Sequence, residues 1–233
     1  MLTESNKNQQ LIDCVETFVG ERLLFGLLGK ALYLIPDKEW LDPLVDDELF
    51  NQAPFASDQP QVVKGLALLS AWSHSFNKDS LSELKIDHTR MFTGTFRIPT
   101  APWESVYFSD ERLVFQEQTL DVRSWYRRFG LEAVEYQKEP DDHIGLELLF
   151  VAHLAGLGMA ACESGDQDRL DEIFEAQRGF LSAHLLRWGP LWCSLVEEHA
   201  QTNFYRGLAL VLQGALLELA KILALPVPDI PGS

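Results

Sequence analysis

The sequence predicts an all-α protein, and three observations support this fold class. Apolar residues recur at three- and four-residue steps over much of the chain, which is the period of amphipathic helices. No convincing ladder of β-strands is evident, because no stretch sustains the alternation of apolar and polar residues. The 233 residues are 46% hydrophobic and 23% charged, an ordinary globular composition. We therefore expect a globular bundle of roughly eight helices.

Proline and glycine mark several of the expected helix boundaries. Pro36 ends the first helix, and Gly130 suits the C-terminal cap of a middle helix. Another helix is expected to begin near Pro140, since proline suits the first helical position. Gly189-Pro190 is expected to divide two later helices. The expected helical ranges are 11–34, shorter pieces within 37–60, 61–76, 80–92, 119–130, a helix from about 140, 167–200 divided in two, and 203–225.

A long irregular, aromatic-rich loop interrupts this pattern at residues 93–110. It holds two prolines, one glycine and four aromatic residues in 18 positions, without a helical or strand period. A segment of this length in a compact domain is usually functional or disordered, and its aromatic content argues against disorder. The aromatic residues either fix the loop onto the core or line a pocket for an apolar ligand. The loop aromatics are Phe96, Trp103, Tyr107 and Phe108.

The domain organisation predicted from the sequence is one all-helical domain over residues 1–233. Two sub-halves, 1–130 and 141–225, are expected to be joined by a hinge at 131–140. This hinge precedes the run Glu-Pro-Asp-Asp-His. No repeat of fixed period is present, which argues against a solenoid.

The charge balance narrows the classes of partner. The net charge of -16 leaves no basic face for phosphate contacts, so we expect no nucleic-acid partner. An acidic surface instead favours cationic partners through long-range attraction.

The cysteine content points to a reducing compartment. Cys14, Cys162 and Cys193 are an odd number and form no Cys-x-x-Cys pair, which argues against a disulfide framework or a zinc ribbon. The N-terminal sequence MLTESNKNQQ lacks the basic-then-apolar order of a secretory signal. The expected location is therefore cytoplasmic.

One segment, residues 144–162, has the length and apolar content of a membrane span. Glu147 and His153 lie inside it, and ionisable groups are costly in lipid. We interpret it as a buried helix of a soluble protein, without stable membrane insertion.

An acidic cluster with a histidine precedes this apolar run in the stretch YQKEPDDHIGLELLF. One explanation is a favourable first helical turn, in which carboxylates meet the positive end of the helix dipole. A metal site is not expected, because no His-Glu-x-x-His and no Glu-x-x-His pair is present. Ser105 does not lie in a Gly-x-Ser-x-Gly elbow, and no phosphate-binding glycine loop occurs. The cluster consists of Glu139, Asp141, Asp142, His143 and Glu147.

Three segments together resemble the TorD/DmsD family of cytoplasmic chaperones for molybdoenzymes, also called redox enzyme maturation proteins. Residues 90–115 resemble the family's Arg-Leu-Phe-x-Gly segment followed by Pro-Pro-Trp/Tyr-x-Ser-Val-Trp/Tyr. Residues 138–150 are similar to its Glu-Pro-x-Asp-His motif and apolar helix, and residues 204–211 resemble its Phe-Tyr-x-x-Leu motif. The chain departs from the pattern at Met91, where leucine is usual, and at Ala101-Pro102, where two prolines are common.

The resemblance implies an all-helical fold and no catalysis of its own. It implies a chaperone that binds the twin-arginine signal peptide of a molybdenum-containing oxidoreductase and assists cofactor insertion before export. Weak guanine-nucleotide binding and domain-swapped dimers are associated with the family, so monomer and swapped dimer both stay open. The sequence does not identify the client reductase.

The expected signal-peptide site combines the resemblance with the chemistry of the leader. Glu139 and Asp142 are suited to pair with arginine, whose planar fork matches a carboxylate. His143 is suited to sense pH or to donate a hydrogen bond to the peptide backbone. The expected site residues are Met91, Phe92, Phe96, Trp103, Tyr107, Glu139, Asp142 and His143.

Two alternative functions remain at this level. The first is a non-catalytic helical adaptor, in which the acidic cluster is only a capped helix start. The second is an enzyme that uses Asp142 and His143 as an acid/base pair.

Overall fold

The structure is a computed structural model that describes residues 4–46, 49–51, 53–93, 98–132 and 139–226. Within these ranges the chain forms nine α-helices and one isolated antiparallel bridge, and no strand. The predicted all-α fold class is confirmed. The helices are α1 (Glu4–Tyr33), α2 (Lys38–Asp46), α3 (Pro60–His74), α4 (Ser80–His88), α5 (Glu117–Arg128), α6 (Ile144–Ser164), α7 (Gln167–Ala183), α8 (Leu185–His199) and α9 (Asn203–Ile222).

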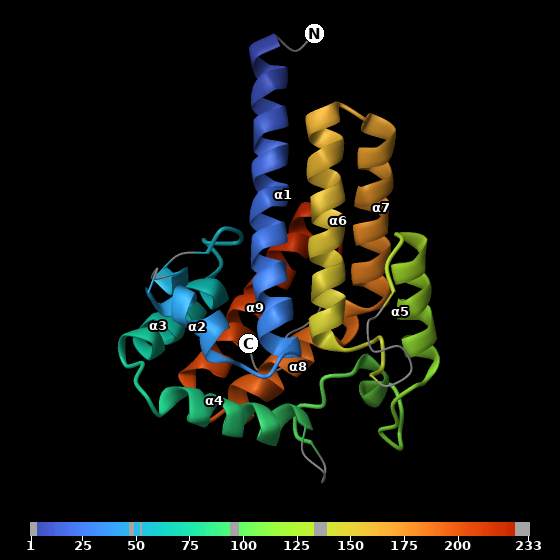
Figure 1. Ribbon diagram of the computed structural model, residues 1–233. Coiled ribbons are helices and arrows are strands. Elements are labelled where there is room, and N and C mark those ends of the chain that lie inside the picture. Colours follow the sequence, from blue (N-terminus) through green and yellow to red (C-terminus); the bar gives the residue numbers. More distant parts are fainter. Residues whose placement is uncertain (1–3, 47–48, 52, 94–97, 133–138, 227–233) are drawn as a thin grey trace.

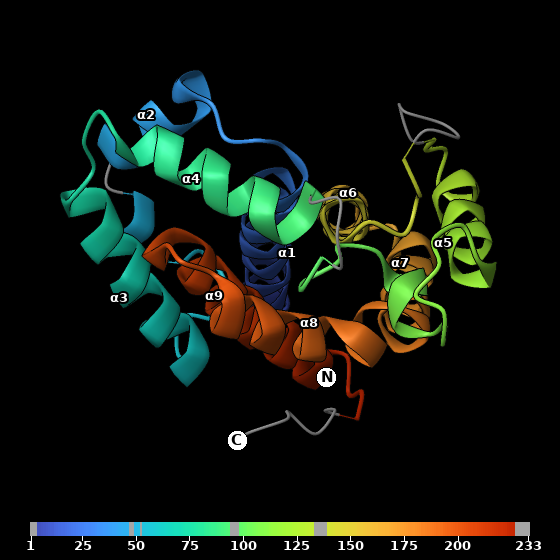
Figure 2. The same ribbon diagram turned by 90° about the horizontal axis from the view of Figure 1, so that it is seen from below.

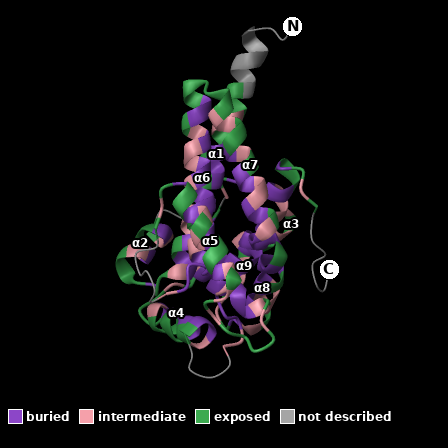
Figure 3. Ribbon diagram, turned by 90° about the vertical axis from the view of Figure 1, so that its right-hand side faces the viewer, coloured by how far each residue is buried: buried purple, intermediate pink, exposed green. Residues whose placement is uncertain are grey.

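Long helices form the centre of the molecule. Helices α1, α6 and α7 stand side by side, and α8 and α9 cross their lower part (Figure 1). Helix α3 packs along α9 on one side, while α5 lies next to α7 on the other (Figure 2). Buried residues follow the faces where these helices meet, and exposed residues follow the outer faces (Figure 3). This is the arrangement expected when amphipathic helices bury their apolar stripes against one another.

The contact between α1 and α6 is unusually close because glycines meet there. A Cβ atom on Gly29 would lie 2.8 Å from the backbone oxygen of Gly145. A Cβ atom on Gly145 would lie 2.6 Å from Cβ of Tyr33. Only glycine permits this approach, which brings the start of α6 against the end of α1.

Three shorter helical turns lie between the α-helices of the described chain. The π-helical turn η2 (Thr89–Thr93) continues α4, and the 3-10 turn η3 (Glu104–Tyr107) lies inside the segment predicted to be irregular. A further 3-10 turn, η1 (Leu49–Asn51), lies against α3. Residues 98–110, the described end of this segment, therefore contain one helical turn.

Two predicted boundaries are wrong. The helix expected near Pro140 begins at Ile144, because Asp141 and Asp142 form a turn, His143 is extended, and Ile144 N donates to the carbonyl oxygen of Pro102. Gly189-Pro190 lies inside α8, and the break falls instead at His184. The dense packing of α8 against α9 keeps Pro190 in a helix despite the lost backbone donor.

Helix α6 is long and apolar enough to cross a membrane by length and composition. In this fold, however, 61% of its most apolar window is buried inside the protein. Its apolarity is therefore explained by its central position between α1 and α7.

Cys14 of α1 and Cys162 of α6 lie against each other across the contact between these helices, with Cα atoms 6.9 Å apart. The contact joins residues 148 positions apart, which the packing of α1 along α6 brings together. Cys193 is buried.

The start of α9 is fixed by a buried carboxylate on α4. Asp87 accepts hydrogen bonds from the backbone nitrogen atoms of Gln201 (3.0 Å) and Thr202 (2.8 Å). It also accepts one from the Thr202 hydroxyl at 2.8 Å and one from Arg90 at 2.8 Å. Four charge-assisted bonds to one carboxylate explain how a buried charge is tolerated between these helices.

A buried carboxyl between α1 and α7 makes stability depend on pH. Burial raises the pKa of Glu21 from its ordinary value of 4.5 to about 8, although a hydrogen bond from Gln177 opposes this. The folded state therefore binds this proton more tightly than the unfolded state. The resulting stability is complete below about pH 4.5 and is lost as the pH rises through about 8.

We predict that Glu21→Gln gains stability over the wild type as the pH rises from 5 to 8. The gain reaches on the order of 3 kcal/mol in the free energy of unfolding, because glutamine never ionises. Urea unfolding at several pH values measures it. Glu16→Gln, an exposed substitution on the same helix, is the matched control. Parallel pH profiles for the two variants would contradict the prediction.

Candidate functional site

The segment before η3 and the segment before α6 are bound together by their backbones. Trp103 and His143 form an isolated antiparallel bridge. Glu104 N donates to the carbonyl oxygen of Asp142 at 2.9 Å. The two segments that the sequence singled out, far apart in the chain, therefore lie side by side.

The Asp142 carboxylate lies fully buried at the centre of this junction. Its Oδ2 atom accepts from the backbone nitrogen of Ser105 at 2.7 Å, and its Oδ1 atom accepts from the Thr119 hydroxyl at 2.7 Å. One carboxylate thus joins three elements: η3, α5 and the start of α6. As placed, both of its oxygen atoms are used by the protein itself.

Asp141 makes a second connection to α5. Its Oδ2 atom accepts from Arg123 Nε at 3.0 Å and from Arg123 Nη2 at 2.6 Å. The backbone oxygen of Asp141 accepts from the Tyr126 hydroxyl at 3.0 Å. The acidic pair Asp141–Asp142 therefore holds α5 against α6 from both sides.

His143 is the N-cap of α6 and is buried. Its Nδ1 atom accepts a hydrogen bond from Gly145 N at 3.0 Å. Burial, and secondarily the nearby His88, lowers the pKa of His143 to about 3, so the ring is neutral at physiological pH. The His143 ring makes T-shaped contacts with two aromatic rings. Its centroid lies 5.1 Å from that of Tyr33 and 6.1 Å from that of Trp103.

The half-buried members of the expected site fall into two groups. Trp103 Nε1 donates to Glu139 Oε1 at 2.7 Å, and we call this pair, with the His143 ring beneath it, the Trp103–Glu139 surface. Tyr107 belongs elsewhere: its hydroxyl donates to Ala101 O at 2.9 Å, and its ring packs 5.3 Å from that of Trp188. The structure therefore brings Trp103, Glu139 and His143 together and separates Tyr107 from their contacts.

Met91 and Phe92 are core residues of the turn η2. Phe92 stacks on Trp192 with ring centroids 5.8 Å apart, and Met91 O accepts from the Thr100 hydroxyl at 2.9 Å. Both side chains are buried in the core, and the segment around Thr100 packs against this turn. Phe96 lies outside the described residues.

The structure also reveals a buried ionisable cluster that the sequence did not indicate as a unit. His184 Nδ1 lies 2.7 Å from Glu104 Oε2, and Trp188 Nε1 donates to Glu147 Oε2 at 3.4 Å. Burial raises the pKa of Glu104, although the hydrogen bond with His184 opposes this. Burial raises the pKa of Glu147 well above its ordinary value, and the carboxyls of Glu104 and Asp142 add to this.

Only part of this cluster left a signal in the sequence. Glu147 is conspicuous because it interrupts an apolar run. Glu104 and His184 are 80 positions apart, and nothing in their local sequence connects them. In the part of the chain that the structure describes, no group of three or more His, Cys, Asp or Glu side chains could hold a metal ion.

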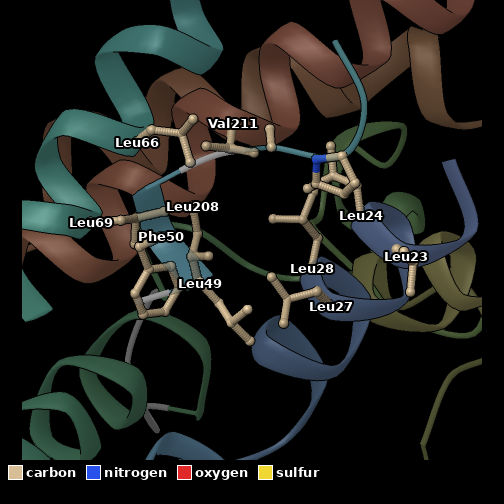
Figure 4. A pocket seen from close by; sticks show the side chains of 12 residues that line it. Leu23, Leu24, Leu27, Leu28, Leu49, Phe50, Leu66, Leu69, Leu208 and Val211 are labelled. Atoms are coloured by element: carbon tan, nitrogen blue, oxygen red, sulfur yellow. The ribbon is translucent and has the colours of Figure 1, made fainter. Parts of the chain in front are cut away.

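A separate apolar cavity of about 460 Å³ lies between α1, η1, α3 and α9. Figure 4 shows its leucine side chains, from α1, η1, α3 and α9, converging on one space. Its volume falls in the range of small-ligand sites, and apolar side chains make up the wall. The lining residues are Leu23, Leu24, Leu27, Leu28, Leu49, Phe50, Ala53, Pro54, Leu66, Leu69, Leu208 and Val211.

The segment 56–194, which contains the Asp142 junction, matches the family model of the nitrate reductase delta subunit. The chain belongs to this family. The match includes η3, α5 and α6, the elements that Asp142 joins.

Curated relatives of this family member are named chaperones. The chain is 28% identical to the Tat proofreading chaperone DmsD of Salmonella typhi, over 86% of this chain and 89% of that protein. It is 26% identical to the chaperone protein TorD of Vibrio vulnificus, over 55% of this chain and 58% of that protein. The resemblance to the TorD/DmsD chaperones seen in the sequence motifs is confirmed.

A solved structure shares the fold. The structure of a putative redox enzyme maturation protein from Archaeoglobus fulgidus matches with a TM-score of 0.51 and 18% sequence identity. The match covers 83% of this chain and 91% of the other. It supports the all-helical architecture.

The Thr119 hydroxyl tests the role of the Asp142 junction. We predict that Thr119→Val lowers the free energy of unfolding by about 1–3 kcal/mol, because a buried carboxylate loses one of its donors. Thr119→Ser is the matched control, since it keeps the hydroxyl and removes only a methyl group. Urea unfolding of both variants measures the effect, and equal losses would argue against the hydrogen bond as the cause.

Proposed function

We propose that this protein is a cytoplasmic chaperone that binds the twin-arginine signal peptide of a molybdenum-containing oxidoreductase. It assists cofactor insertion into that partner before export and catalyses no reaction of its own. The observation that carries the proposal is the similarity to a Tat proofreading chaperone along 86% of the chain. Two of the three motif segments, 90–115 and 138–150, lie within the family match at 56–194, and the third, 204–211, follows it.

The chemistry of such a leader suits this molecule. A twin-arginine leader presents two guanidinium groups followed by an apolar stretch. The protein offers a net charge of -16, which attracts a basic peptide at long range. It also offers half-buried aromatic and acidic side chains at the Trp103–Glu139 surface, and carboxylates are the natural partners of arginine.

We assign different roles to the residues of the expected site. Glu139 and Trp103 are the members that contact the leader, because they are only half buried. Asp142 is a positioning residue, because its carboxylate holds the backbone next to Trp103 through the hydrogen bond from Ser105 N. If the carboxylate turned toward a ligand, it would lose this hydrogen bond. His143, neutral and buried under Trp103, orients the indole ring.

We predict that a synthetic twin-arginine leader binds with a Kd of about 1 μM or tighter in calorimetric titration. A twin-lysine counterpart binds more weakly, because lysine lacks the planar fork of arginine. Affinity for the leader falls as salt is raised from low to moderate concentration, because the attraction to the acidic surface is screened.

The same titration separates the proposal from a purely structural role of the acidic cluster. If leaders from several molybdenum oxidoreductases fail to bind at low salt, the proposed function is wrong. Glu139→Gln provides a further comparison: it weakens binding of the leader, because it removes the carboxylate charge while keeping an oxygen acceptor for Trp103 Nε1.

A further inference from the structure

A second pocket of about 610 Å³ opens between α5, η3 and the junction of α7 with α8. Figure 2 shows α5 lying beside α7, on the opposite side of the molecule from α3. This pocket is distinct from the apolar cavity, and polar side chains dominate its wall. We call it the acidic pocket. Its lining residues are Glu104, Glu117, Gln118, Leu120, Asp121, Ser124, Ala183, His184 and Arg187.

Two buried polar atoms at the base of the acidic pocket lack hydrogen-bond partners. Glu104 is fully buried, and its Oε1 atom accepts no hydrogen bond within the described chain. His184 is also buried, and its Nε2 atom lies 3.3 Å from Asp121 Oδ2 without the geometry of a hydrogen bond. Buried polar groups are nearly always satisfied, so these atoms indicate a missing partner.

The rim of the acidic pocket carries two carboxylates of like charge. Glu117 and Asp121 are exposed and stand four residues apart on one face of α5, where like charges repel. Glu117 gains from the dipole at the start of α5, but Asp121 lies one turn further and gains less. A bound cation would remove this repulsion.

The side chains that line the acidic pocket favour an organic cation with an apolar stem over a metal ion. Leu120, 61% exposed, also lines the pocket and offers an apolar surface to a side-chain stem. Arg187 also lines it and its positive charge acts on Glu104, while its guanidinium stacks 4.3 Å from the centre of the Phe108 ring. No group of side chains in the described chain has the arrangement of a metal site, and phosphate would be repelled.

We propose that the acidic pocket binds the guanidinium group of an arginine in the basic peptide that the protein receives. The planar group presents several donors at fixed angles, which can serve Glu104 Oε1 at the base and Asp121 at the rim together. The methylene stem lies along Leu120. This inference rests on the proposed function, since it names a place for one arginine of the leader.

The experiment is a double-mutant cycle in calorimetry with the full-length protein. The probes are a synthetic twin-arginine leader and counterparts with either arginine replaced by lysine. The variants are Asp121→Asn and Glu117→Gln, both at exposed positions that leave the core intact. The control is Asp168→Asn, which makes the same change of charge on the first turn of α7, far from its end at Ala183.

We expect Asp121→Asn to weaken leader binding roughly tenfold and Glu117→Gln by a smaller factor. Asp168→Asn leaves the affinity nearly unchanged. The effect of Asp121→Asn shrinks markedly for one of the two lysine-substituted leaders, which identifies the arginine that enters the acidic pocket. Independently, Nα-acetylarginine amide shifts the imidazole NMR signals of His184 in the wild type and not in Asp121→Asn.

Two outcomes would overturn the inference, and they are distinguishable. If the leader binds the wild type and both pocket variants equally well, the proposed function stands and the acidic pocket is not its arginine site. If no leader binds the wild type and Nα-acetylarginine amide leaves His184 unchanged, both proposals fail. Equal losses in Asp121→Asn and Asp168→Asn would assign the effect to overall charge and would also overturn the inference.

Discussion

The buried carboxylate of Asp142 is the interaction on which the arrangement around α6 depends. It accepts from Ser105 of η3 and from Thr119 of α5 while its own backbone oxygen accepts from Glu104. Three segments from separate parts of the chain therefore meet at one side chain. A buried charge is tolerated only when hydrogen bonds replace its lost hydration, so the three segments must be correctly placed together.

This constraint explains the positions of the residues that face outward. Because Ser105 is fixed, the neighbouring Trp103 is directed toward Glu139 and His143, and Glu104 reaches His184 at the break between α7 and α8. The Trp103–Glu139 surface and the acidic pocket are thus contributed by adjacent residues of one ordered segment. A loop fixed in this way presents polar groups with little further loss of conformational entropy on binding.

Burial shifts the pKa of three ionisable side chains in the interior away from their ordinary values. Burial lowers the pKa of His88 to about 4 and that of His143 to about 3, whereas it raises that of Glu21 to about 8. Protonation of the two histidines therefore lowers the free energy of unfolding as the pH falls, and ionisation of Glu21 lowers it as the pH rises. Between these limits the three groups are neutral, whereas the chain as a whole carries a net charge of -16.

Local patterns in the sequence predicted the long helices and the family. Helical periodicity located the long helices, although α1 begins at Glu4 rather than at residue 11, and the three motif segments together led to the correct family. The position of Pro190 within α8 was missed because packing against α9 outweighs the local cost of proline. Asp142 and His143 were recognised as important, but their partners Ser105, Thr119 and Gly145 depend on tertiary contacts that no spacing reveals. The Glu104–His184 pair was invisible for the same reason.

We propose that the segment fixed by Asp142 forms the receiving face for the leader. Hydrogen–deuterium exchange of the full-length protein, with and without a synthetic twin-arginine leader, tests it most directly. We expect slower exchange at residues 98–107, in α5 and at the junction of α7 with α8 when the leader is bound. Protection confined to α1, α3 and α9 around the apolar cavity, with no change at residues 98–107, would contradict it.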